Sequence, residues 1–176
     1  MNLANKITIS RILLIPFFIA FVLYSKLEAA FVVFIIASIS DALDGYVARV
    51  MNQRTELGEI LDPLADKALL LSAFICLSTA STIPAYLNIP AYVLIIVISR
   101  DAIIVFGIIL IHFIKGSIAI RPSPVGKITT FFQMLTILGV LIGAKFSPIL
   151  WNAAVVLTII SGAYYIKEGS RLLSEK

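Results

Sequence analysis

Four aspartates stand at helical spacing within one short stretch of a chain that is otherwise dominated by apolar residues. Asp41 and Asp44 are three positions apart and Asp62 and Asp66 are four apart, so each pair would share one face of a helix. Carboxylates are costly at membrane depth, where they line polar cavities, pair with cations or bind metal ions. Hard oxygen ligands of this kind suit Mg²⁺ or Mn²⁺, whereas zinc would favour His or Cys. The spacing therefore predicts a metal site formed by two consecutive helices.

A charge balance separates this interpretation from a purely structural one. Two divalent ions would neutralise the four carboxylates of the two pairs. The structural alternative is a cluster of charges paired with Arg49, Lys67 and Arg100. We favour the metal site because the Arg and Lys neighbours of the cluster are too few to neutralise four carboxylates.

The same stretch contains a longer pattern, D-x2-D-G-x2-A-R-x8-G-x3-D-x3-D, and meets it at every fixed position. The fixed residues are Asp41, Asp44, Gly45, Ala48, Arg49, Gly58, Asp62 and Asp66. With this pattern the chain resembles the CDP-alcohol phosphotransferases, membrane enzymes that move a phosphatidyl-type group from a CDP-lipid to an alcohol. The opening NLANKITISRILLIP and the later GKITTFFQ are also similar to the bacterial phosphatidylglycerophosphate synthases of that family.

The resemblance implies a role for each aspartate. The residues implied as ligands of Mg²⁺ or Mn²⁺, with two ions in the site, are Asp41, Asp44, Asp62 and Asp66. Asp66 would also act as the general base, since an alcohol hydroxyl is a poor nucleophile until its proton is removed. The implied reaction is CDP-diacylglycerol plus an alcohol, giving a phosphatidyl alcohol and CMP. No Ser, Cys or His stands beside the aspartates as an obvious covalent nucleophile, so we expect direct transfer.

A second set of residues would bind the CDP-lipid by the same resemblance: Asn5, Thr8, Gly45, Ala48, Arg49 and Gly58. Small residues at positions 45 and 48 would leave room for the nucleotide, although they equally permit close packing of helices. Arg49 can make paired hydrogen bonds to phosphate oxygens. Asn5 would bond the donor diphosphate or, as the alternative, cap the first helix.

The acceptor would meet cations elsewhere in the chain. Arg100 interrupts an apolar span, where it would receive the acceptor's phosphate or, as the alternative, form a local structural pair with an aspartate. Arg121 and Lys127 are weaker candidates, because a basic loop explains them adequately. The resemblance suggests sn-glycerol 3-phosphate as the acceptor, and inositol phosphate or another alcohol is the alternative.

Composition indicates the class of protein. The chain of 176 residues is 60% hydrophobic and 14% charged, and its mean hydropathy is +1.05. These values are typical of an all-α integral membrane protein, which we expect to form a single domain over residues 1–176. We predict six transmembrane helices at about Ile7–Tyr24, Ala29–Ala48, Leu57–Leu77, Pro90–Ile114, Ile128–Ala144 and Ile149–Ile166.

The distribution of basic residues predicts the orientation. With six spans, the following ten of the 14 Lys and Arg fall on one side: Lys6, Arg11, Arg49, Arg54, Lys115, Arg121, Lys127, Lys167, Arg171 and Lys176. The positive-inside rule then places both termini and the metal site at the cytoplasmic face of the inner membrane. The net charge of +4 is explained by this topology and by anionic lipid headgroups, and we expect no nucleic-acid partner.

Two other classes of membrane protein also use buried carboxylates. A membrane prenyltransferase usually has its aspartate motifs in distant segments of a longer chain, whereas here all four lie close together. A small cation transporter has no need for Gly45, Ala48 and Arg49 at fixed spacing. The family resemblance further implies a homodimer.

Overall fold

The computed structural model describes residues 3–50, 56–81, 83–115 and 123–174, and it describes side chains for 8–40, 64–81, 83–111, 113–114 and 123–174. The described residues form six α-helices: α1 (Leu3–Leu23), α2 (Leu27–Val50), α3 (Glu56–Thr79), α4 (Ala91–Lys115), α5 (Pro124–Leu141) and α6 (Ser147–Ser174). The prediction of an all-helical protein is confirmed, and each predicted span corresponds to one helix.

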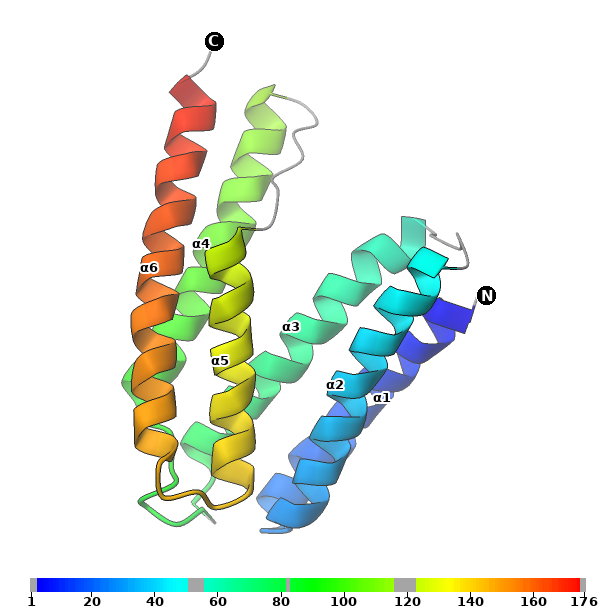
Figure 1. Ribbon diagram of the computed structural model, residues 1–176, viewed down its shortest axis with the longest axis vertical. Helices are drawn as coiled ribbons and strands as arrows, with labels where there is room; N and C mark the ends of the chain where they lie inside the picture. Colours follow the sequence, from blue (N-terminus) through cyan, green and yellow to red (C-terminus); the bar gives the residue numbers. More distant parts are fainter. Residues whose placement is uncertain (1–2, 51–55, 82, 116–122, 175–176) are drawn as a thin grey trace. The chain divides into compact units, whose positions relative to one another are not determined.

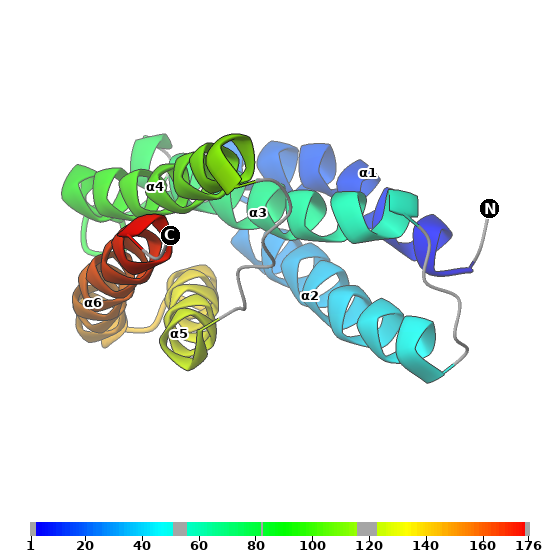
Figure 2. The same cartoon turned by 90° about the horizontal axis from the view of Figure 1, so that it is seen from above.

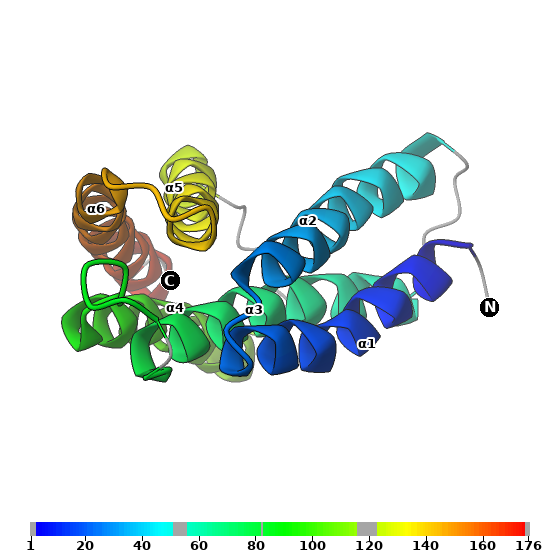
Figure 3. The same ribbon diagram turned by 90° about the horizontal axis from the view of Figure 1, so that it is seen from below.

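The helices belong to two compact units. Unit 1 comprises Met1–Asn88 and Val140–Ala144, and unit 2 comprises Ile89–Gly139 and Lys145–Lys176. Within unit 1, α1 packs against both α2 and α3 (Figures 1 and 2). Within unit 2, α4 and α6 pack side by side and run in the same direction (Figures 1 and 3). The part of α5 that belongs to this unit runs in the opposite direction (Figure 1).

An aromatic pair and small residues form the contact between α1 and α2. Phe18 and Phe34 are fully buried, and their ring centroids lie 5.8 Å apart. Ala30 and Ala37, on the same helix as Phe34, are also fully buried. Alanines allow the two backbones to approach closely, which is how helices pack where lipid supplies no hydrophobic driving force.

The turn after α1 follows a standard C-terminal capping motif. The Lys26 amide donates to the Phe21 carbonyl at 2.8 Å, and the Ser25 amide donates to the Val22 carbonyl at 3.0 Å. Ser25 has a φ of 57°, the left-handed conformation that this motif requires after a helix. The chain therefore reverses within a few residues, so that α2 can return along α1.

The start of α5 differs from the prediction. We expected a basic loop up to Lys127, but the helix begins at Pro124. Ser123 caps it, since its Oγ accepts a hydrogen bond from the Gly126 amide at 3.0 Å. Proline is favoured in the first helical turn, where its missing N–H has no intrahelical partner. Pro124 is thus part of the helix start and not of a loop.

The end of α6 also differs. The predicted span ended near Ile166, whereas α6 continues to Ser174 through the charged segment. A helix of 28 residues is about 42 Å long, which exceeds a hydrocarbon core of about 30 Å. Its last turns carry Lys167, Glu168 and Arg171, which suits a helix end beyond the hydrocarbon.

Buried polar side chains connect α5 with α6 inside unit 2. The Gln133 amide Nε2 donates to Thr158 Oγ1 at 3.2 Å, and both residues are buried. Thr129 Oγ1 lies 2.8 Å from the Val125 carbonyl oxygen on its own helix and 3.1 Å from the Leu157 carbonyl oxygen on α6. Such interhelical hydrogen bonds are common in membrane proteins.

Three helices in the described part of the chain are long and apolar enough to cross a membrane. They are the Ala91–Ile111 part of α4, α5, and α6. Shorter apolar stretches occupy Thr8–Leu23 of α1 and Leu27–Ser40 of α2. The apolar helices indicate a membrane protein, and a bilayer crossing by all six helices stays a prediction.

The packing of α5 on α6 generates a stability prediction. A Cβ atom at Gly139 would lie 2.8 Å from Leu150 Cδ1 and 3.3 Å from Ser147 Oγ, whereas a Cβ at Gly107 would meet nothing within 4 Å. We expect Gly139→Val to lower the free energy of unfolding by about 1–3 kcal/mol through overpacking. Gly107→Val is the matched control, a valine at a helical glycine with open space. Thermal unfolding in detergent measures both, and equal melting temperatures for the two variants would contradict the close contact.

Candidate functional site

The four aspartates lie on two helix segments at one end of unit 1. Asp41 and Asp44 are in the last turns of α2, and Asp62 and Asp66 are in the first turns of α3. The end of α2 and the start of α3 lie at the same end of the unit as the start of α1 (Figure 1). The helical spacing predicted for the aspartates is confirmed at the level of the backbone, because both segments are α-helical.

The arrangement of most of these side chains lies outside the described residues. This applies to Asn5, Asp41, Asp44, Gly45, Ala48, Arg49, Gly58 and Asp62, and Arg121 lies wholly outside. Among the described side chains, no group of three or more His, Cys, Asp or Glu could hold a metal ion, but Asp66 is the one predicted ligand in that part. The side chain of Asp66 is half-buried. The metal site therefore stays a prediction.

Two polar side chains near the start of α1 are fully enclosed. Thr8 was predicted to bind the donor, and its side chain has no exposed surface. Arg11 is also fully buried and is the largest such side chain in the described part of the chain. We had counted Arg11 among the cytoplasmic-side cations and missed its burial. The sequence signal for this burial was the position of Arg11 three residues after Thr8, which places both side chains on the same helix face.

Arg100 is the centre of a polar cluster in unit 2. Only 6% of its surface is exposed. Its Nε and Nη2 donate to the Ser161 hydroxyl of α6 at 3.3 and 2.8 Å, and Nη1 donates to Asp101 Oδ1 at 2.7 Å. The pair with Asp101 is the structural role that we had weighed for Arg100. This pair involves one of the five N–H groups of the guanidinium.

Tyr165 and the start of α5 complete the cluster. The guanidinium carbon of Arg100 lies 5.5 Å from the centroid of the Tyr165 ring, a cation–π contact. The hydroxyl of Tyr165 accepts a hydrogen bond from the Ser123 amide at 3.2 Å. A Cβ at Gly126 would lie 3.0 Å from this hydroxyl and 3.2 Å from Arg100 Nη2. Only a glycine lets the first turn of α5 approach so closely.

Lys127 follows in the same turn of α5, where its side chain is exposed. The structure thus brings Arg100 together with Ser161, Tyr165, Ser123 and Gly126. In the sequence, Gly126 is recognisable only as part of the GKITTFFQ segment, and Ser161 and Tyr165 do not stand out. No local pattern marks these two residues, because their partners are far away in the chain.

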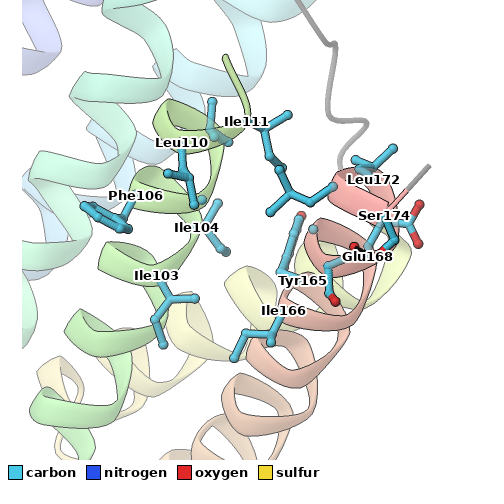
Figure 4. A pocket seen from close by; sticks show the side chains of 15 residues that line it. Ile103, Ile104, Phe106, Leu110, Ile111, Tyr165, Ile166, Glu168, Leu172 and Ser174 are labelled. Carbon is cyan, nitrogen blue, oxygen red and sulfur yellow. Dashed lines mark hydrogen bonds between the residues drawn. The ribbon is translucent and has the colours of Figure 1, made fainter. Parts of the chain in front are cut away.

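A pocket of about 470 Å³ lies between α4 and α6 (Figure 4). Aliphatic side chains of both helices form most of its wall, and Tyr165 projects into the space between the helices. Among the described lining residues, Glu168 is the one carboxylate. A lining of this kind suits apolar groups and not a diphosphate, so the pocket is not the predicted metal site.

The comparisons with known proteins agree with one another. The family model described as CDP-alcohol phosphatidyltransferase matches residues 1–160. The CDP-diacylglycerol–glycerol-3-phosphate 3-phosphatidyltransferase of Bacillus subtilis is 34% identical, over 95% of this chain and 94% of the relative. The protein of the same name from Aquifex aeolicus is 33% identical over 98% of both chains. A probable phosphatidylglycerophosphate synthase of Mycobacterium tuberculosis is 30% identical over 97% of this chain and 82% of the relative.

Proposed function

Because the chain belongs to the CDP-alcohol phosphatidyltransferase family, we propose that this membrane enzyme transfers the phosphatidyl group of CDP-diacylglycerol to sn-glycerol 3-phosphate. The products are phosphatidylglycerophosphate and CMP, and the pathway is phospholipid biosynthesis. The observation that carries the proposal is the similarity over nearly the whole chain to relatives named for this reaction. The expectation of a CDP-alcohol phosphatidyltransferase is confirmed by the family match.

The donor set of the four aspartates fits a divalent metal ion. Carboxylate oxygens are the ligands that Mg²⁺ and Mn²⁺ prefer, and the backbone presents the aspartates at helical spacing on α2 and α3. Asp41, Asp44, Asp62 and Asp66 would hold two such ions. When bound, the ions supply positive charge that stabilises the diphosphate and the departing CMP.

The residues of the chain would then perform a direct displacement. Asp66 accepts the proton of the free primary hydroxyl of glycerol 3-phosphate. The hydroxyl oxygen bonds to the phosphorus that carries the diacylglycerol, and the bond from that phosphorus to the oxygen of CMP breaks. The leaving group takes its electron pair with it as the CMP phosphate. Asn5, Thr8, Gly45, Ala48, Arg49 and Gly58 would bind and orient the CDP-lipid.

Arg100 would bind the phosphate of the acceptor. One N–H on each terminal nitrogen of its guanidinium donates to none of the side chains or backbone groups that the structure describes. Two parallel N–H groups match two oxygens of a phosphate. Arg121 and Lys127 would add positive charge. This recognition does not distinguish glycerol 3-phosphate from inositol phosphate, so a panel of acceptors must decide between them.

The wider arrangement of the enzyme is part of the same proposal. The chain would form one functional domain over residues 1–176 and cross the cytoplasmic membrane six times, with both termini on the cytoplasmic side, as a homodimer. Incubation of the purified protein with labelled CDP-diacylglycerol and a panel of acceptors, followed by identification of the lipid product, tests the function. A failure to release CMP with any acceptor would favour the transporter alternative.

The first prediction from this site concerns the metal ions. Asp41→Asn and Asp62→Asn each remove an anionic oxygen ligand, so turnover should be lost and divalent ions should bind more weakly. The measurements are CMP release as a function of Mg²⁺ and Mn²⁺ concentration and direct titration of the metal. Near wild-type activity of either variant at low Mg²⁺ would contradict the two-pair site.

The second prediction separates Asp66 from the other aspartates. Asp66→Asn keeps one ligand oxygen but does not accept a proton, and general-base catalysis contributes about 10²–10⁴-fold. We expect near-normal binding of CDP-diacylglycerol, a kcat lower by that order, and a residual rate without the pH dependence of a titrating base. A donor-binding titration and a pH–rate profile test this. A variant with at least about a tenth of wild-type kcat would exclude Asp66 as the base.

The third prediction concerns the acceptor. Loss of a charged hydrogen-bond partner costs on the order of 1.5–3 kcal/mol, or about 10- to 150-fold in binding. Arg100→Ala should therefore raise the KM for glycerol 3-phosphate by this factor and leave the KM for CDP-diacylglycerol nearly unchanged. Steady-state kinetics with each substrate varied in turn measures both constants. Equal effects on both would show that Arg100 does not bind the acceptor.

A further inference from the structure

The side chains around Arg100 do more than neutralise its charge. Among the described side chains, Asp101 supplies the opposite charge, with its Oδ1 at 2.7 Å from Arg100 Nη1. Ser161 and Tyr165, both on α6, add a hydrogen-bond acceptor and an aromatic face. Neutralising the charge of Arg100 requires only a counter-ion. The contacts of α6 with the edge and the face of the guanidinium therefore have another effect, which is to fix its orientation.

Ser161 determines which N–H groups of Arg100 remain available. Its Oγ accepts from Nε and Nη2, so it occupies one edge of the planar guanidinium. With Nη1 bonded to Asp101, one N–H on Nη1 and one on Nη2 donate to no group in the part of the chain that the structure describes. These two nitrogens share a carbon, and each has an N–H group that can donate to an oxygen of a phosphate.

Tyr165 restrains the plane of the guanidinium and connects it to α5. Its ring lies 5.5 Å from the guanidinium carbon, and its hydroxyl accepts from the Ser123 amide at 3.2 Å. Ser123 in turn caps α5 through the Gly126 amide at 3.0 Å. The orientation of Arg100 and the position of the first turn of α5 are therefore coupled through one side chain.

We propose that Ser161 and Tyr165 are positioning residues for acceptor binding, which hold the guanidinium of Arg100 so that its two remaining N–H groups face the acceptor phosphate. This inference rests on the proposed role of Arg100. Ser161 and Tyr165 would then increase the affinity for the acceptor without touching it themselves. Gly126 contributes to the same arrangement, because the Cβ of any other residue there would lie too close to Arg100 Nη2 and to the Tyr165 hydroxyl.

The test uses variants that remove one contact each. Ser161→Ala removes the acceptor for two N–H groups, and Ser161→Thr keeps the hydroxyl. Tyr165→Leu removes the ring and the hydroxyl, and Tyr165→Phe removes only the hydroxyl. The matched control is Tyr92→Phe, because the Tyr92 hydroxyl also joins α4 to α6, through Asn152 Oδ1 at 2.9 Å, without contact to Arg100. Thermal unfolding in detergent verifies that each variant is folded.

We expect a selective effect on the acceptor. Ser161→Ala and Tyr165→Leu should raise the KM for glycerol 3-phosphate about 3- to 10-fold, as loss of one hydrogen bond or cation–π contact does. The KM for CDP-diacylglycerol should stay within about 2-fold of wild type, and Ser161→Thr should restore the acceptor KM. Tyr165→Phe should have a smaller effect, and Tyr92→Phe should behave as wild type. Unchanged acceptor constants in Ser161→Ala and Tyr165→Leu, or equal changes for both substrates, would overturn the proposal.

A binding titration separates this inference from the proposed function. Glycerol 3-phosphate and, in a second arm, inorganic phosphate are titrated against each protein without the CDP-lipid. If the wild type binds them but does not turn over glycerol 3-phosphate, the proposed function fails. Weaker binding by Ser161→Ala and by Arg100→Ala would then still support the positioning role. Equal binding by wild type and Ser161→Ala, or no dependence on Arg100, would overturn it whatever the activity.

Discussion

Polar groups within apolar helices must find their partners inside the protein, because hydrocarbon offers none. Arg100 shows how strongly this constraint acts. Its guanidinium is enclosed by Ser161 and Tyr165 of α6 and by Asp101 of its own helix. The contact of Gln133 with Thr158 satisfies two more buried groups between α5 and α6. Because these bonds are directional, each allows only a narrow range of rotation and register for the helices that it joins.

Unit 1 meets the same constraint in another way. Its contact between α1 and α2 includes Phe18 and Phe34, whose buried rings need no polar partner. The four aspartates of the predicted metal site belong to the last turns of α2 and the first turns of α3, at one end of the unit. Arg11 and Thr8 are fully buried on α1, the helix that packs against both.

Several features of the fold followed from local chemistry alone. The apolar runs predicted six helices, and six are found in the described part of the chain. The errors lie at helix ends, where a few residues decide the outcome. The prediction placed Pro124 in a basic loop that ended at Lys127, but capping by Ser123 makes Pro124 the first residue of α5. The prediction ended α6 near Ile166 because hydropathy falls there, although a helix needs no apolar residues once it leaves the bilayer.

The residues of the aspartate pattern, their helical spacing and the family could all be read from the sequence, because they depend on residues close together in the chain. The surroundings of Arg100 could not. Ser161 lies 61 positions from Arg100, and Ser123 lies 42 positions from Tyr165. Whether such residues meet depends on how each helix is rotated and how far it is shifted along its neighbour. A run of similar aliphatic residues leaves both nearly undetermined, so only the tertiary structure decided which side chains hold the arginine.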